Sequence, residues 1–418
     1  MQRVGRARRR RRRPWRWIGA LVLAVGASAW FAGRTAPHPI EPAVRVIASA
    51  QRPSVAPQRA ATRPPTQRRA PRPAPRAAPR ARHAGEVEIC GFGEVRLPAD
   101  DPYGLNLVPD VVRRTALDAV DERMLASGDE QVQAAALMIG AQARGDEARS
   151  RIDRLARLAG HSQDPVVYAI AVEACRAWTP DEGGACQLLS RAQWVHLDPD
   201  NALPWLELAA EAERAHEPDA EAEAMHRAAS ARRSDAHAGV LPALVERALD
   251  DAHAAPLQRT LALSASWSAQ AAWAPPRSGQ AYLYCTAESL ADANRQQTCD
   301  ALAQTLALRG MSLADVSVGV AIGRNVGWPA QRLQTLQQEL DALGQAGRFQ
   351  SAVGLDLSCE AVERTQEWMR RVAAEGEVQA AREELARSGR SVEQWSARYR
   401  KDFALARATA EAAATASP

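Results

Sequence analysis

The chain has 418 residues, and its 53 basic and 49 acidic side chains are segregated along the sequence. Residues 1–83 contain 20 arginines and one acid, Glu41, so residues 84–418 hold the other 33 basic and 48 acidic side chains. The net charge of +4 averages a basic N-terminal part with an acidic body. The acidic balance of the body excludes a nucleic-acid-binding protein of the usual basic kind.

The N-terminal part begins with a membrane-directing pattern. Residues 1–16 contain nine arginines, and residues 17–33 carry no charge. A helix of that length would span roughly 25 Å, and the arginines would hold its N-terminus in the cytoplasm. This predicts a transmembrane anchor, with the body in the periplasm of a bacterial envelope. Ala27-Ser28-Ala29 also fits a signal-peptidase site, which would release the body into the periplasm or the medium. Both readings export the body.

A linker follows at residues 34–83, which are dominated by proline, arginine and alanine. This composition cannot bury enough apolar surface to fold, so we expect a disordered spacer with extended polyproline stretches. Its arginines would either rest on anionic lipid head groups of the inner membrane or remain solvated.

The body, residues 84–418, is predicted to be all-α. Only Gly85–Leu97 alternates like a strand, and we expect a short extended entry segment there. The rest has apolar residues at helical spacing between proline and glycine breaks, which predicts about fourteen to sixteen short helices in antiparallel hairpins. Helix-start signals of the capping-box kind occur at Thr179–Glu182 and Ser312–Asp315.

A repeat lies within the first half of the body. Asp164-Pro165 and Asp198-Pro199 are 34 residues apart. Large and small residues of the second unit fall at characteristic positions, namely Trp205, Leu208, Ala209, Met225 and Ala228. Residues 164–233 therefore resemble the tetratricopeptide repeat family, although Ala212 and Glu221 depart from its pattern. The resemblance implies an α-solenoid over 84–240, with further helical hairpins over 241–418, and it implies binding of peptides or partner proteins.

Six cysteines in an exported chain favour disulfides, although several pairings are possible. Residues equidistant from a hairpin turn face each other. The midpoint between Cys175 and Cys186 falls in the turn at residues 180–181, and that between Cys285 and Cys299 falls at Asp292. Cys90 and Cys359 then remain as a pair. Metal binding and buried free thiols are the alternative states of these side chains.

No catalytic or phosphate-binding motif occurs, so no catalytic residue, metal ligand or cofactor is predicted. The histidines at positions 216, 226, 237 and 253 are interpreted as solvated surface. The tryptophans at positions 178, 194 and 205 fall on core positions of the repeat, and a carbohydrate groove is the alternative for them.

Two function classes follow. The first is a non-catalytic, membrane-tethered or exported scaffold that binds an unidentified protein or peptide of the cell envelope. Its partner surface would include Glu207, Glu211 and Arg214, on the expected concave face. The second is an enzyme that acts on an envelope polymer such as peptidoglycan, with a site assembled from dispersed acids.

Overall fold

A computed structural model describes residues 86–96, 107–142, 146–176, 184–251, 253–273, 278–351 and 356–416. The predicted anchor or signal helix at 17–33, the linker at 34–83 and the helix-start signal at Thr179–Glu182 lie outside these residues. Within the described ranges, no helix is long and apolar enough to cross a membrane.

The body enters through a β-hairpin rather than a single extended segment. Strands β1 (Glu86–Ile89) and β2 (Gly93–Arg96) pair antiparallel, with Val87 opposite Val95. Gly91 turns the chain between them at a φ of 79°, which a residue with a side chain rarely adopts. A Cβ at Gly91 would also meet the backbone at Leu257, so the turn lies directly against the following structure.

The rest of the described body is helical, in agreement with the predicted class. Sixteen α-helices are present in the described residues, together with two short 3₁₀ helices, η3 (Ala185–Leu188) and η4 (Ala287–Ala291). The α-helices are α2 (Asp110–Leu125), α3 (Glu130–Gly140), α4 (Asp146–His161), α5 (Pro165–Arg176), α6 (Arg191–Leu197), α7 (Ala202–Arg214), α8 (Pro218–Ser230), α9 (Val240–Asp251), α10 (Pro256–Ala271), α11 (Ser278–Tyr284), α12 (Ala293–Arg309), α13 (Leu313–Asn325), α14 (Ala330–Ser351), α15 (Cys359–Glu375), α16 (Glu377–Arg387) and α17 (Val392–Ala416).

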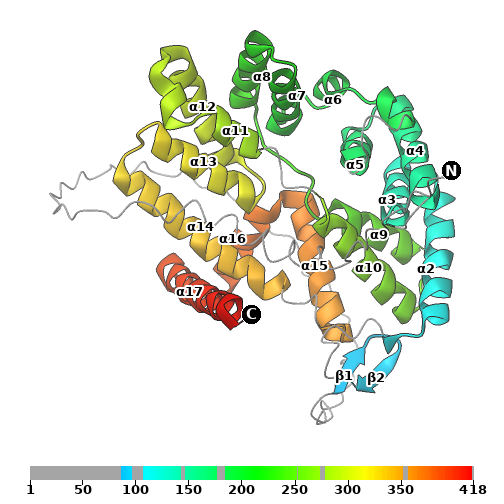
Figure 1. Cartoon of the computed structure of the whole chain (residues 1–418). Coiled ribbons are helices and arrows are strands. Elements are labelled where there is room, and N and C mark those ends of the chain that lie inside the picture. Colours follow the sequence, from blue (N-terminus) through cyan, green and yellow to red (C-terminus); the bar gives the residue numbers. More distant parts are fainter. Residues whose placement is uncertain are drawn as a thin grey trace, which may run out of the picture. The chain divides into compact units, whose positions relative to one another are not determined.

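Most helices pack on their neighbours in the chain. Helix α3 packs on α2 and α4, α7 on α8, and α12 on α13. Helix α8 packs on α12 although α9 and α10 lie between them in the sequence (Figure 1). The α9–α10 hairpin instead packs on α2 and α3 on one side and on α15 on the other. Residues 84–418 therefore form one compact unit in which early and late helices meet.

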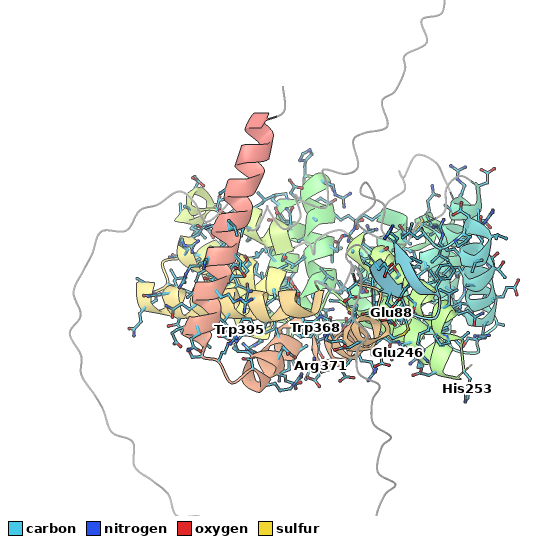
Figure 2. All side chains as sticks on the ribbon, turned by 90° about the horizontal axis from the view of Figure 1, so that it is seen from below. Glu88, Glu246, His253, Trp368, Arg371 and Trp395 are labelled. Carbon is cyan, nitrogen blue, oxygen red and sulfur yellow. A yellow bond between two sulfur atoms is a disulfide. The ribbon has the colours of Figure 1, made fainter. Side chains whose placement is uncertain are left out.

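The contact between α9 and α15 is partly ionic. Glu246 of α9 is buried, and its carboxylate accepts a hydrogen bond from Arg370 Nε at 3.0 Å (Figure 2). On the same helix α15, the Arg371 guanidinium lies 5.5 Å from the ring centre of Trp368, within cation–π range. The Glu246–Arg370 contact joins residues 124 positions apart in the chain.

The α7–α8 hairpin matches the repeat pattern read from the sequence. Ala209, Met225 and Ala228 are fully buried between the two helices, as small and large core residues of a helical pair should be. The preceding unit differs, because α5 is followed by η3 and the seven-residue helix α6 instead of one long second helix. The predicted helix start at Ser312 is present, since its hydroxyl accepts a hydrogen bond from the Asp315 amide at 3.1 Å.

The six cysteines form three disulfides, in the pairs expected from the sequence. Cys175–Cys186 joins α5 to η3, and Cys285–Cys299 joins the end of α11 to α12. Cys90–Cys359 joins the turn of the β-hairpin to the first residue of α15 across a sequence separation of 269. No free cysteine occurs in the described body, where all six are paired. Such bonds persist in oxidising compartments and indicate a body that folds outside the cytoplasm.

Candidate functional site

The 231–239 segment, which connects α8 to α9, positions the candidate site. It exchanges backbone hydrogen bonds with both flanking parts of the chain: Ala202 N donates to Arg233 O at 2.8 Å, and Met311 N donates to Ser234 O at 2.8 Å. Val378 N in turn donates to Met311 O at 3.1 Å. The segment thereby fixes the starts of α7, α13 and α16 around itself.

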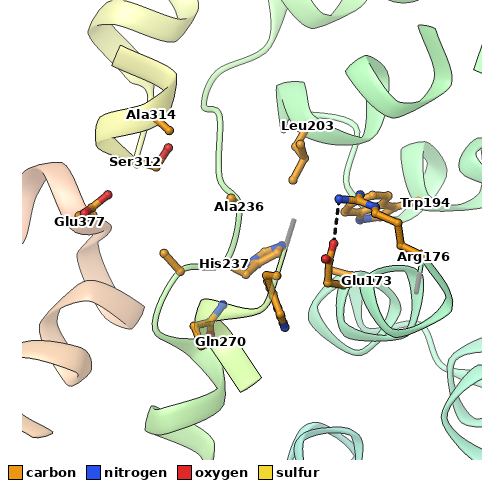
Figure 3. Close-up of a pocket in the computed structure, with 13 residues that line it drawn as sticks. Glu173, Arg176, Trp194, Leu203, Ala236, His237, Gln270, Ser312, Ala314 and Glu377 are labelled. Atoms are coloured by element: carbon orange, nitrogen blue, oxygen red, sulfur yellow. Dashed lines mark ion pairs between the residues drawn. The ribbon is translucent and has the colours of Figure 1, made fainter. Parts of the chain in front are cut away.

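A pocket of about 240 Å³ opens beside this segment. Helices α5, α6, α7, α10, α13 and α16 contribute to its wall (Figure 3). Much of the lining is apolar, including Ala169, Leu203, Ala236, Ala238 and Ala314. An apolar cavity with a few polar groups converging on it is the usual form of a binding site.

Arg176, at the C-terminal end of α5, is held by two carboxylates. Its Nη1 lies 2.9 Å from Glu173 Oε2, and its Nη2 lies 2.6 Å from Glu207 Oε1. Glu173 and Arg176 face the pocket in Figure 3, whereas Glu207 has only 1% of its side chain exposed. The guanidinium thus bridges one carboxylate at the pocket and one buried carboxylate.

Four buried polar atoms of the pocket wall have no hydrogen-bond partner among the described residues. They are Arg176 Nε, Trp194 Nε1, Trp273 Nε1 and His237 Nε2. The indoles of Trp205, Trp328 and Trp395, in contrast, each donate to a protein oxygen. An unpaired buried polar group costs about 1–3 kcal/mol, so these four atoms make the pocket wall a locally costly part of the fold.

His237 projects from the 231–239 segment toward the side of the pocket that carries Glu173 and Arg176 (Figure 3). Its φ of 52° lies in the left-handed region, and its amide donates to Asp235 Oδ1 at 2.8 Å. Its Nδ1 lies 3.4 Å from Asp235 Oδ2. In a neutral imidazole with the proton on Nδ1 facing that carboxylate, Nε2 is a hydrogen-bond acceptor.

Two acids, the buried Asp315 and the half-buried Glu377, lie at the start of α13. Glu377 lines the pocket and accepts a hydrogen bond from Leu313 N at 3.0 Å; burial raises its pKa, and that hydrogen bond partly offsets the rise. Burial also raises the pKa of Asp315 to about 6. Hydrogen bonds from nearby serine hydroxyls lower this pKa, and the negative charge of Asp235 raises it further. Glu377 satisfies the Leu313 amide in the first turn of α13, and the Asp315 carboxylate accepts a hydrogen bond from the Ser234 hydroxyl at 3.1 Å, so both acids have a structural role.

Asp315 makes the stability of the body depend on pH. Its pKa in the folded state lies above its ordinary value of 3.8, so ionisation costs more in the folded than in the unfolded chain. The stabilisation is complete below about pH 4 and is lost as the pH rises through 6. We expect the unfolding free energy of the wild type to fall by about 2 kcal/mol between pH 4 and pH 7.5, and we expect an Asp315→Asn variant not to show this fall.

Denaturant unfolding of both chains across this pH range measures the difference. Asp292→Asn is the control, because Asp292 is an exposed acid at the start of α12, where its carboxylate accepts from Arg295 N at 2.8 Å. Parallel pH profiles for the wild type and Asp315→Asn would contradict the prediction.

The structure separates the three residues of the predicted partner surface. Glu211 and Arg214 are exposed near the C-terminal end of α7. The prediction for Glu207 was wrong, because this carboxylate is buried against Arg176 and is inaccessible to a partner. One turn of helix separates Glu207 from Glu211, and only Glu207 is buried and paired with Arg176 of α5.

The interpretation of the histidines as solvated surface is confirmed for His216, His226 and His253, which are exposed. Figure 2 shows His253 at the outer edge of the body. The interpretation was wrong for His237, whose side chain is only 9% exposed. Trp194 is buried as expected, Trp205 is half-buried, and Trp178 lies outside the described residues.

Sequence reasoning missed Arg176, His237 and Trp273 as residues of one site. No local motif links them, since they belong to α5, the 231–239 segment and the end of α10. Their common signal is tertiary: polar atoms left unpaired at one cavity. Among the described residues no group of three or more acidic, histidine or cysteine side chains is arranged to hold a metal ion.

Comparison of this chain with protein-family models, with curated protein sequences and with solved structures returned no match.

Proposed function

We propose that this protein is a tethered or exported binding protein of the bacterial cell envelope, and that its pocket holds part of a partner protein or peptide. The observation that carries the proposal is the pocket itself, where a largely apolar wall is accompanied by the polar side chains of Glu173, Arg176 and His237. A binding role uses such groups to orient a ligand, and it requires no reactive side chain.

The hairpin architecture supports the same role. The α7–α8 hairpin has the buried small-residue contact on which the tetratricopeptide resemblance rests, and arrays of such hairpins present extended binding surfaces. Glu211 and Arg214 are exposed beside this hairpin and remain proposed as part of the partner surface. Disulfides Cys175–Cys186 and Cys285–Cys299 hold neighbouring helical segments together.

The N-terminal sequence supports a location at the inner membrane. An apolar segment at 17–33 behind nine arginines would anchor the chain once, with the body in the periplasm. The proline-rich linker at 34–83 would let the body reach away from the membrane surface. Cleavage after Ala29 would instead release the body as a soluble periplasmic or secreted protein.

Site-specific photocrosslinking in the cell of origin tests the proposal. Ala314 lines the pocket and is exposed, so a photoreactive amino acid at this position reports on an occupant of the pocket. Leu283, which is 64% exposed on α11 and does not line the pocket, is the control position. We expect one adduct of defined mass from position 314, identified as an envelope protein or peptide, that is absent from position 283. Equal labelling at both positions, or none at 314, would contradict the proposal.

An envelope enzyme is the second candidate, and one observation favours it. Glu377 has a raised pKa and lines the same pocket as Glu173, and perturbed carboxyl groups in a cavity are common in acid–base catalysis. Incubation of the purified chain with isolated peptidoglycan tests this role. Release of soluble fragments by the wild type but not by Glu377→Gln would support catalysis, and no release would exclude it for this polymer.

A further inference from the structure

Asp315, on the first turn of α13, is a buried carboxyl group without a basic partner. Only 1% of the residue is exposed, and its Oδ2 accepts a hydrogen bond from the Ser234 hydroxyl at 3.1 Å. The hydroxyls of Ser278 and Ser312 lie beside the same carboxyl group, and the nearby charge is the like charge of Asp235. No cation of the described body is among the groups that act on it. Because a charge buried without a countercharge is costly, this core holds the neutral carboxyl more easily than the carboxylate.

The elements packed around Asp315 bring no free countercharge to it. Glu377 of α16 is a second acid, and α11 has no charged side chain between Ser278 and Tyr284. The other charged side chains near the contact are engaged elsewhere: Asp235 with His237, Arg233 with Asp198, Arg309 of α12 with Ala231 O, and Glu339 and Asp341 of α14 with Arg382 and Arg400.

The same contact holds the 231–239 segment against the start of α13. Ser234 N donates to Arg309 O at 3.2 Å, and Ser234 O accepts from Met311 N at 2.8 Å, while the hydroxyl of the same residue donates to Asp315. Both sides of the contact contribute to the pocket wall, the segment with Ala236, His237 and Ala238 and α13 with Ser312 and Ala314. A change at Asp315 therefore reaches the pocket.

Ionisation of Asp315 favours an opening that lets water reach the carboxylate. The least costly opening separates the elements that are joined by the fewest contacts. The 231–239 segment has no helix of its own and is held to the start of α13 through Ser234, whereas α13 itself packs on α11, α12 and α14. Elements of low local stability open before the rest of a fold does. The segment should therefore move, and the helices should stay in place.

We infer that the contact between Ser234 and Asp315 is a proton-controlled latch on the pocket: it is closed while Asp315 is protonated, and it opens when Asp315 is ionised, which frees the pocket residues of the 231–239 segment. The neutral carboxyl group still accepts from the Ser234 hydroxyl in the closed state. The latch acts on the pocket wall whatever molecule occupies the pocket, so this inference goes beyond the proposed binding function and does not rest on it.

Amide-resolved hydrogen–deuterium exchange of the full-length chain at pH 5 and pH 7.5 tests the latch. Each rate is divided by the intrinsic rate at the same pH, which gives a protection factor. The Asp315 carboxyl has a pKa of about 6 when the latch is closed and regains its ordinary pKa of 3.8 when hydrated. The closed state is therefore fully stabilised below about pH 4 and loses this stabilisation as the pH rises through 6. We expect the protection of the Ser234 and Met311 amides to fall about tenfold between the two pH values.

Variants assign the effect to its group. Asp315→Asn keeps the shape of the side chain and removes its titration, so protection of the two latch amides should change less than about twofold. Ser234→Ala removes a donor that favours the carboxylate, so its fall should be larger than that of the wild type, measured at Met311. Asp292→Asn, which changes an exposed acid at the start of α12, should keep the full wild-type fall.

The amides of α3, where residues 134–138 are all buried, report on global unfolding in the same experiment. We expect them to be better protected than the latch amides at both pH values. Equal protection in α3 and in the latch would show that the segment opens only when the whole body unfolds, and it would overturn the inference. Unchanged protection in the wild type would overturn it too. So would a fall that persists in Asp315→Asn, because that variant retains His237 and Glu377 and the effect would belong to one of them.

Discussion

Removal of the Cys90–Cys359 disulfide is expected to destabilise the body more than removal of either other bond. The bond closes a loop of 269 residues, and the chain-entropy relation gives about 5–6 kcal/mol for a loop of that length. It holds the β-hairpin against α15 at a point where Cys90 N also donates to Leu357 O at 2.8 Å. A Cys90→Ser/Cys359→Ser variant should therefore unfold at much lower denaturant concentration.

The Cys175→Ser/Cys186→Ser variant provides the comparison. This bond closes a separation of 11 residues, for which the same relation gives about 3 kcal/mol. Both double variants remove two buried or half-buried sulfurs, so the difference between them isolates loop length. Equal loss of unfolding free energy in the two variants would show that loop entropy does not set the contribution of these bonds.

Charge reversal at Glu207 is expected to cost at least about 4 kcal/mol of unfolding free energy. A lysine there would replace the carboxylate that lies 2.6 Å from Arg176 and would place a second cation in a buried site. The penalty for an uncompensated buried charge is several kcal/mol. Thermal or denaturant unfolding of Glu207→Lys measures it.

Glu211→Lys is the matched control for this variant, since it makes the same change one helical turn later at an exposed position of α7. Surface substitutions of this kind usually change stability by less than about 0.5 kcal/mol. A Glu207→Lys protein as stable as Glu211→Lys would mean that the ion pair of Glu207 with Arg176 does not stabilise the body.

Local patterns in the sequence determined the helical class and several helix boundaries. The Ser312 hydroxyl caps α13, and α5 and α8 begin at Pro165 and Pro218, because these signals act within one turn of helix. The pairing of the two short-range disulfides could also be predicted from the sequence, since in a hairpin two residues at similar distance from the turn face each other.

The pairing of Cys90 with Cys359 followed from the sequence only by elimination, and its physical basis is tertiary. The β-hairpin meets α15 because Ile89 and Leu357 share a small apolar cluster with Leu261 of α10. Neither residue has a local pattern that indicates this contact. The position of α9 and α10 between α3 and α15 likewise depends on how complete faces of these helices pack against one another.

The candidate site was decided by tertiary structure alone. Helical periodicity gave Glu207 and Glu211 the same expected exposure, but the structure buries Glu207, which pairs with Arg176 of α5, and leaves Glu211 in solvent. His237 belongs to a segment without regular structure, so no period could assign its direction. Periodicity reports which face of one helix is apolar, whereas a pocket requires the relative placement of α5, α6, α10 and the 231–239 segment. That placement depends on packing between residues far apart in the chain.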